Sequence, residues 1–273
     1  IAGAKIPLSI EPMKITLGFS PCPNDTYMFA ALVNGWIDTL GLTFDVRMAD
    51  VETLNEWAAS GTLDVSKISF NRALSLENQY SLLSSGAALG NGCGPLLIAK
   101  EPMTREKIMQ GLVALPGQWT TAHLLFTIFY PEASHKKFYP FHHIEDAVLN
   151  GEVTSGVIIH ENRFTYEDKG LVKITDLGEA WESRTGLPIP LGGIFASNRL
   201  PADVISRMES LIRESILFAR THPDQVMPYV RQYAQEMDEM VMKSHIGLYV
   251  NDFSLDLGSK GIKAVEMLKK MTR

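Results

Sequence analysis

Short apolar segments alternate with amphipathic segments along most of the chain. The first apolar run, KITLGFS (14–20), predicts a β-strand, and after the turn PCPN the apolar spacing in DTYMFAALVNG (25–35) predicts a helix. The same alternation predicts strands at 42–49, 63–70 and 93–100 and helical segments at 51–61 and 71–79. Strands that alternate with helices are typical of α/β proteins with parallel sheets, which is the fold class we expect.

The alternation begins again after the glycine-rich loop GNGCGP. It predicts strands at 111–117, 155–160, 171–177 and 191–197 and helices at 120–130 and 144–152. The chain then ends in amphipathic segments that predict helices at 201–220, 223–234, 237–250 and 258–272. No internal repeat or low-complexity tract interrupts this pattern.

Two such units predict a two-lobed protein with a ligand cleft between the lobes. The pattern indicates that the chain crosses from one unit to the other near 96–100 and again near 191–197. Residues 13–98 and 198–273 are therefore expected to form the first lobe and residues 99–197 the second. In open α/β sheets, ligands bind outside the carboxyl ends of the strands, so functional side chains are expected there.

Local signals mark the ends of the first helices. Asn24 or Asp25 is expected to cap the helix at 25–35, because a short polar side chain can accept from the free N–H groups of the first turn. Asp50 is the expected cap of the next helix, and Gly61 its expected stop.

Composition and charge exclude several classes of protein. Apolar residues make up 45% and charged residues 21% of the chain, which is typical of a globular protein. The formal net charge is −6, and no run of Lys or Arg exceeds two residues, so nucleic-acid binding is not predicted. No apolar run approaches the roughly 18 residues needed to cross a bilayer, so no membrane association is predicted. Nothing in the pattern specifies an oligomeric state.

The cysteine count and the N-terminal residues favour a reducing compartment. Cys22 and Cys93 are too few for a disulfide scaffold and lack the spacing of a zinc site, so we expect free thiols. Residues 1–12 have no signal-peptide core, and a predicted strand follows Met13 at once. We expect Met13 to be the natural start and residues 1–12 to be a cloning remnant, with a native extension as the alternative. The predicted location is the cytoplasm.

Polar residues follow several of the predicted strands. SPCPNDT (20–26), SKISF (66–70) and PGQWTTA (116–122) each stand where a strand gives way to a turn or helix. Helix N-termini present unpaired N–H groups and positive potential, so Thr120, Thr121 and Ala122 are expected to form a cradle for a carboxylate. Ser69 is expected to add a hydroxyl group. The alternative is that Thr120 or Thr121 only caps its helix.

The stretch GVIIHENRFTY (156–166) delivers an imidazole and a carboxyl group directly after an apolar strand. His160 is either a general base or a structural histidine, and the residues alone leave both possibilities open. Glu161 and Arg163 are expected to pair with each other or with the lobe surfaces. Cys22 also follows a strand, but the sequence does not identify a histidine that would activate it as a nucleophile.

Motifs for metals and nucleotides are missing from the sequence. The histidines show no HxxxH or HxH spacing, so no metal site is predicted. There is no GxGxxG after a predicted strand and no Walker motif, so a nucleotide cofactor is not predicted.

Several motifs together resemble a known family. SPCPNDTYMF, DVETLNEWA, KISF, GNGCGPL, GVIIHENRFTY and TGLPIPLGG are similar to motifs of the 1,4-dihydroxy-6-naphthoate synthase family of the futalosine route to menaquinone. The resemblance extends from about Met13 to near the C-terminus and includes HIGLYVNDFSLDLG (245–258). It implies the two-lobed fold of type II periplasmic binding proteins and a cytoplasmic enzyme.

The resemblance also implies an activity and its residues. A member of this family is a carbon–carbon lyase that converts cyclic dehypoxanthinyl futalosine, a small-molecule carboxylate, to 1,4-dihydroxy-6-naphthoate, without a metal or an organic cofactor. The family's catalytic base falls on His160, and its ligand-binding segments fall on Lys67, Ile68, Ser69, Thr121 and Ala122. Two stretches depart from the family pattern: Asn71–Arg72 after KISF, and residues 131–143.

Two rival functions are expected to share this fold. Chorismate dehydratase, the sister enzyme of the same pathway, also holds a carboxylate and catalyses an elimination, but the combination of SPCPNDT with IIHE favours the naphthoate synthase. A solute-binding protein would capture a small anion without chemistry, and such a protein has no need of His160. A ligand-sensing regulatory domain has no support, since no helix-turn-helix or basic face is predicted.

Overall fold

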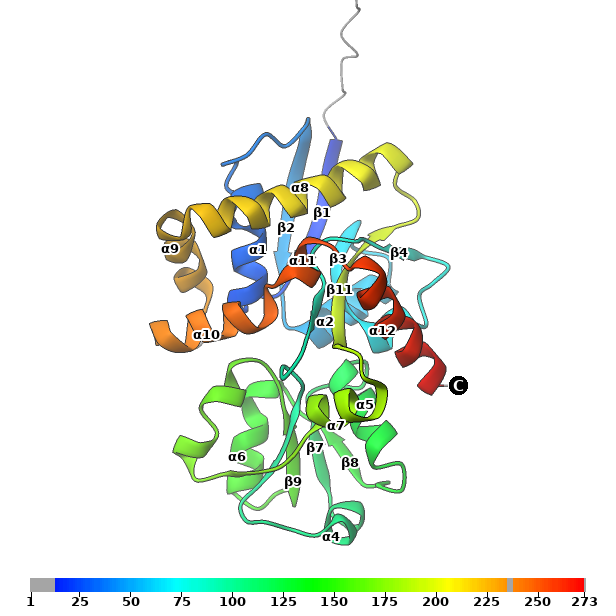
Figure 1. Ribbon diagram of the computed structural model, residues 1–273, viewed down its shortest axis with the longest axis vertical. Coiled ribbons are helices and arrows are strands. Elements are labelled where there is room, and N and C mark those ends of the chain that lie inside the picture. The colour runs from blue at the N-terminus through cyan, green and yellow to red at the C-terminus, as the bar shows by residue number, and fades with distance from the viewer. Residues whose placement is uncertain (1–12, 235–237, 273) are drawn as a thin grey trace, which may run out of the picture.

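Two β-sheets form the centres of two lobes (Figure 1). The computed structural model describes residues 13–234 and 238–272. The expectation for residues 1–12 and the predicted helix start at 237 therefore lie outside the described residues.

The sheet of the first lobe has the strand order β2-β1-β3-β11-β4, and β5 also pairs with β11. Its strands are β1 (Met13–Phe19), β2 (Leu42–Met48), β3 (Val65–Ser69), β4 (Tyr80–Leu82), β5 (Ala88–Gly90) and β11 (Ile189–Ser197). The sheet of the second lobe has the order β10-β6-β9-β7-β8. Its strands are β6 (Leu96–Ala99), β7 (Val113–Leu115), β8 (Lys136–Phe138), β9 (Ser155–Ile158) and β10 (Val172–Asp176).

Helices cover both sheets, and those of the C-terminal region return to the first lobe (Figure 1). The α-helices are α1 (Pro23–Val33), α2 (Val51–Ala59), α3 (Phe70–Ala73), α4 (Arg105–Gln110), α5 (Thr121–Phe129), α6 (Ile144–Leu149), α7 (Leu177–Thr185), α8 (Ala202–Thr221), α9 (Pro223–Tyr233), α10 (Glu239–Tyr249), α11 (Asp252–Leu255) and α12 (Gly258–Met271). Three 3₁₀ turns are η1 (Phe141–His143), η2 (His160–Phe164) and η3 (Glu167–Lys169). No helix among the described residues is long and apolar enough to cross a membrane.

The predicted α/β fold class is confirmed, but the sheets are mixed and not purely parallel. β1 runs parallel to β2 and β3, whereas β11 is antiparallel to β3, β4 and β5. In the second sheet, β6 is antiparallel to β9 and β10. β6 and β11 are the two crossing strands, and each enters its sheet from the other lobe, so neither is part of a right-handed crossover that would make it parallel.

Strand pairing also places the two crossings differently from the predicted boundaries. β6 lies almost wholly on the first-lobe side of the 98/99 boundary but pairs in the second sheet. β11 lies on the second-lobe side of the 197/198 boundary but pairs in the first sheet. Both strands are apolar and buried on both faces, so their sequence does not reveal which sheet they join.

The predicted helix caps have different outcomes. Asp50 accepts from the backbone N–H groups of Glu52 and Thr53 and caps α2 as expected, and Gly61 follows the last turn with a left-handed φ of 69°. The expectation for Asn24 or Asp25 was wrong. Pro23 occupies the first turn of α1, which moves the N-cap back to Cys22.

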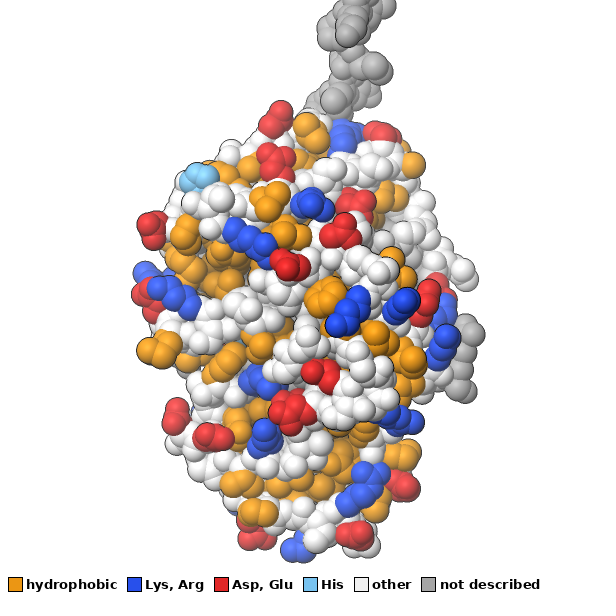
Figure 2. All heavy atoms as spheres, viewed as in Figure 1, with side chains coloured by type: hydrophobic (Ala, Val, Ile, Leu, Met, Phe, Trp, Pro, Cys, Tyr) orange, Lys and Arg blue, Asp and Glu red, His pale blue; other side chains and the backbone are white. Residues whose placement is uncertain are grey.

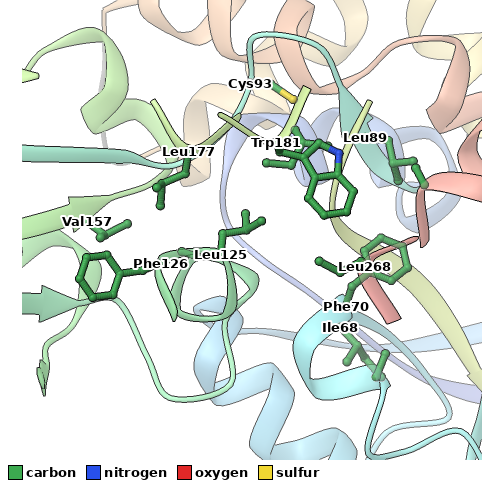
Figure 3. Packing of buried hydrophobic residues seen from close by; sticks show 14 of the residues in the cluster. Ile68, Phe70, Leu89, Cys93, Leu125, Phe126, Val157, Leu177, Trp181 and Leu268 are labelled. Carbon is green, nitrogen blue, oxygen red and sulfur yellow. The ribbon is translucent and has the colours of Figure 1, made fainter. Parts of the chain in front are cut away.

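One apolar core joins the two lobes on the side of α7. It contains Ile68 and Phe70 from the first lobe, Phe126 and Val157 from the second, and the fully buried Trp181 of α7 (Figure 3). The indole N–H of Trp181 donates to the carbonyl of Pro188 at 3.1 Å. On the face drawn in Figure 2, basic and acidic side chains are interspersed over both lobes.

Truncation of Trp181 tests whether the lobes depend on this shared core. We expect Trp181→Ala to lower the free energy of unfolding by about 3–5 kcal/mol, because it leaves a large cavity. Urea denaturation followed by circular dichroism measures this change. Trp57→Ala on α2 is the control, because Trp57 is only partly buried and should cost less. Equal losses in the two variants would contradict the prediction.

Candidate functional site

A cavity lies between the lobes, and the space free of protein atoms in it and at its opening to solvent is about 670 Å³. Its walls come from both lobes: the segments after β1, β3 and β9, the start of α5, the middle of β11, and α10. The predicted residues Lys67, Ser69, Thr121, Ala122 and His160 all line it. Ile68 does not, because its side chain is fully buried in the shared apolar core.

A buried ion pair lies against the cavity where β1 and β3 end. Lys67 Nζ donates to Asp25 Oδ1 at 2.8 Å, and the two side chains are only 7% and 1% exposed. Asn24 Nδ2 donates to the same oxygen, and the backbone N–H and hydroxyl of Ser20 donate to Asp25 Oδ2. Four donors therefore satisfy the carboxylate. Removing Lys67 alone would leave a buried charge without its partner.

The hydroxyl group of Ser69 is held by α2. Asn55 Nδ2 donates to Ser69 Oγ at 3.1 Å, and Asn55 Oδ1 accepts from the backbone N–H of Ser69 at 2.9 Å. Because its acceptor role is used by Asn55, Ser69 keeps its hydroxyl proton to donate to a ligand. The predicted hydroxyl at the end of β3 is therefore present and oriented.

The start of α5 has its cap at Thr120 and not at Thr121. Thr120 Oγ1 accepts from the backbone N–H of His123 at 3.2 Å. The hydroxyl of Thr121 donates to the carbonyl of Leu191 on β11 and accepts from the backbone N–H of Asn71 at 3.3 Å. It therefore joins the lobes, and what Thr121 and Ala122 can offer a ligand is the N–H groups of the first helical turn.

His160 begins the 3₁₀ turn η2 and has a left-handed φ of 59°. A non-glycine residue in this conformation is strained, and such strain is concentrated at functional sites. The ring packs edge-to-face on Phe141, with 4.8 Å between the centroids. Burial lowers the pKa of His160 to about 4, since the opposing charges of Asp25 and Lys67 act as smaller effects of opposite sign. The imidazole is therefore neutral near pH 7.

Cys22 contacts His160 across the two lobes, which sequence reasoning did not foresee. Cys22 Sγ lies 3.4 Å from His160 Nδ1, and the two residues are 138 positions apart. Burial raises the pKa of the Cys22 thiol well above its usual value, and the nearby charge of Glu161 raises it further. Cys22 is therefore a neutral thiol, which is unsuited to be a nucleophile.

The same place contains potential metal donors. A sulfur of Cys22, a ring nitrogen of His160 and a carboxylate oxygen of Glu161 lie within 4.8 Å of one another, the only group of this kind among the described residues. These atom types suit zinc, whose ligands in a tetrahedral site are about 3.3–3.8 Å apart. The donors come from both lobes, so histidine spacing in the sequence had no means of revealing them.

Arg163 has a structural partner. Its guanidinium donates to Asp176 Oδ2 at 2.7 Å and also to the carbonyl of Gly94. Asp176 in turn caps α7. Arg163 thus fixes η2 against the segment before β6 and the end of β10, and it does not line the cavity.

A set of contacts that we call the lobe clasp closes one side of the cavity. Its first-lobe members are Glu52, Asn71 and Arg72, and its second-lobe member is the loop 117–120. Glu52 accepts from the backbone N–H of Trp119 at 2.9 Å, and burial raises the pKa of this carboxyl. Arg72 stacks over the indole of Trp119 at 4.0 Å.

Asn71 completes the clasp. Its side-chain amide donates to the carbonyls of Gln118 and Thr120 at 3.3 and 3.1 Å. Asn71 and Arg72, at which the sequence departs from the family pattern, therefore form contacts between the two lobes beside Ser69.

The chain is similar to known proteins along most of its length. Residues 15–273 match the profile of a family described as menaquinone biosynthesis. The chain is 43% identical to a 1,4-dihydroxy-6-naphthoate synthase of Thermus thermophilus, over 93% of this chain and 92% of the relative. It is 42% identical to the protein of the same name from Streptomyces coelicolor, over 93% and 91% of the two chains.

Solved structures agree in fold. A protein of Archaeoglobus fulgidus has a TM-score of 0.89 at 33% identity, covering 95% of this chain and 96% of that one. A Candida albicans protein described as having the periplasmic binding protein fold has a TM-score of 0.70 at 11% identity, covering 95% and 90% of the two chains. The second likeness concerns the fold alone. The predicted two-lobed fold is confirmed.

Gly117 tests the lobe clasp. Its φ is 153°, and a Cβ added there would lie 2.5 Å from Glu52 Cδ. We expect Gly117→Ala to displace Glu52 and weaken the affinity for a cavity ligand by roughly five- to a hundredfold, the equivalent of about 1–3 kcal/mol of backbone strain and lost contact. Isothermal titration calorimetry with 1,4-dihydroxy-6-naphthoate measures the affinity.

Gly170→Ala is the matched control, because Gly170 also has a positive φ, of 79°, but no atom within 4 Å of its added Cβ. It should lower stability without changing ligand affinity. Equal ligand affinities for Gly117→Ala and Gly170→Ala would show that the lobe clasp does not contribute to ligand binding.

Proposed function

The chain belongs to the menaquinone biosynthesis family, and on this premise we propose that it is a lyase that converts cyclic dehypoxanthinyl futalosine to 1,4-dihydroxy-6-naphthoate. The observation that carries the proposal is a neutral, strained imidazole at the wall of an inter-lobe cavity. A protein that only binds an anion has no use for such a base. The proposed location of the enzyme is the cytoplasm.

The substrate carboxylate is held at the start of α5. The N–H groups of Thr121 and Ala122 point out of the first helical turn, where the helix dipole favours negative charge. Ser69 donates its hydroxyl proton from the facing lobe, and the ammonium group of Lys67 adds positive charge nearby. The ligand thereby connects the two lobes and favours their closed arrangement.

His160 acts as the general base on the bound substrate. When its proton is on Nδ1, that N–H donates to the sulfur of Cys22 and leaves Nε2 as the basic nitrogen. A neutral thiol is a suitable partner because it adds no charge that would raise the pKa of the ring. Proton removal leads to cleavage of the carbon–carbon bond, release of the sugar-derived fragment and formation of the aromatic ring.

The protein's own residues supply every group in this scheme. Aromatisation provides much of the driving force, so the scheme needs only one well-placed base. Such a base contributes about a hundred- to ten-thousandfold in rate. The closed cavity and the clasp exclude water during the reaction.

One assay separates this function from its rivals. Purified protein is incubated with cyclic dehypoxanthinyl futalosine, and the dihydroxynaphthoate is detected by mass and absorbance. Chorismate is offered in a parallel reaction. Product from chorismate alone would identify a chorismate dehydratase, and binding of either compound without product would identify a solute-binding protein.

Replacement of His160 tests its role as the base. We expect His160→Asn to fold and to bind 1,4-dihydroxy-6-naphthoate nearly as well as the wild type, because the carboxylate is held elsewhere. Single-turnover rates should fall about a hundred- to ten-thousandfold. His135→Asn, on the exposed surface, is the control. Normal turnover by His160→Asn would show that His160 is structural.

The pH dependence of turnover is a separate prediction. Only the neutral imidazole is a base, and burial lowers its pKa to about 4. As the pH falls, kcat/KM should therefore stay level through the ordinary histidine range near 6.5 and decline only toward pH 4. Circular dichroism at each pH checks that the protein stays folded. A midpoint near 6.5 would contradict the buried, neutral base.

A further inference from the structure

A second imidazole lies in the wall of the same cavity. His245, on α10, is fully buried and lines the cavity. Within residues 13–234 and 238–272, neither its Nδ1 nor its Nε2 has a hydrogen-bond partner. Its ring centroid lies 6.3 Å from that of His160 and 4.7 Å from that of Tyr249.

This imidazole is neutral and has two unused hydrogen-bonding positions. Burial has the largest effect on the pKa of His245 and, together with the electrostatic effects of His160 and Lys67, it holds that pKa well below its usual value. A neutral imidazole offers one N–H donor and one acceptor nitrogen. Leaving both without partners in a buried position destabilises the protein, so a purely structural role would favour an apolar side chain here.

Other histidines near the cavity have a partner for at least one ring nitrogen. His123, on helix α5, has its Nδ1 2.8 Å from the carbonyl of Gln118. His160 has Cys22 beside its Nδ1. An unpaired polar side chain that lines a ligand cavity is explained if the ligand supplies its partner.

The spacing of the two rings indicates what that partner is. The two ring centroids are only 6.3 Å apart, and a hydrogen bond joins heavy atoms about 2.7–3.2 Å apart, so a single oxygen atom can be within hydrogen-bonding reach of both rings. One substrate oxygen can therefore lie between His160 and His245. Since both rings are neutral, a hydroxyl group fits this place better than a carboxylate, because its O–H can donate to Nε2 of His160 while its oxygen accepts from the N–H of His245.

We propose that His245 contacts the substrate directly and donates a hydrogen bond to one of the two ring oxygens that become the hydroxyl groups of the dihydroxynaphthoate. The inference rests on the proposed function and extends it by assigning the oxygen-bearing ring to the α10 side of the cavity. In that position the N–H of His245 stabilises negative charge that develops on the oxygen as His160 removes a proton.

A comparison of two ligands tests this contact without relying on turnover. The probes are 1,4-dihydroxy-6-naphthoate and 2-naphthoate, which is the same ring carboxylate without the hydroxyl groups. Their affinities are measured by calorimetry for the wild type, His245→Phe and His245→Gln. We expect His245→Phe to weaken binding of the dihydroxy compound by about ten- to a hundredfold and to leave 2-naphthoate unchanged. His245→Gln keeps a donor and should retain part of the preference.

Met242→Leu is the control on the same helix, since Met242 is fully buried and does not line the cavity. It should change neither affinity. Equal weakening of both ligands in His245→Phe would mean that His245 only shapes the cavity, and an unchanged preference would overturn the contact. If His245→Phe does not fold, a reduced preference in His245→Gln supports the contact, and a preference equal to that of the wild type overturns it. A wild type that converts futalosine substrate while His245→Phe keeps its preference refutes this inference alone, whereas a wild type inactive on that substrate refutes the proposed function.

Discussion

The ion pair between Asp25 and Lys67 is the constraint around which the cavity is built. It joins the segment after β1 to the end of β3, and both charges are almost completely buried. Because Asp25 accepts from four donors, the SPCPND turn has little freedom to take another shape. This fixed turn places Cys22 against His160. An uncompensated charge at either position would disturb both strand ends at once.

The same pair explains why the imidazole of His160 can be neutral beside two charged groups. Asp25 raises the pKa of His160 and Lys67 lowers it, so the paired charges partly cancel at the ring. Desolvation then has the largest effect. A lone carboxylate in that place would favour the protonated ring. The compact pair thus holds positive charge near the ligand while the imidazole remains neutral.

Local structure was largely predictable from the sequence, but contacts between distant segments were not. Apolar periodicity predicted most helices and most strands but missed the three-residue strand β8, and the strand-end rule together with family resemblance pointed to His160. No local signal could place Cys22 beside a histidine 138 positions away, or reveal that Asp25 binds Lys67 and not a helix end. Asn71 and Arg72 departed from the family pattern, and only the lobe clasp gives that departure a physical reason.

The path of the chain through the two crossing strands has a consequence for synthesis on the ribosome. All strands of the second sheet lie between residues 96 and 176, so that sheet can form as soon as this stretch has emerged. The first sheet must wait for β11, and α1 also waits for α8 and α9, which cover it. The N-terminal strands, although made first, therefore remain without part of their sheet until much of the chain has been translated. During that interval their apolar faces lack the partners that bury them in the folded protein, and unpaired apolar strands of this kind are prone to aggregation.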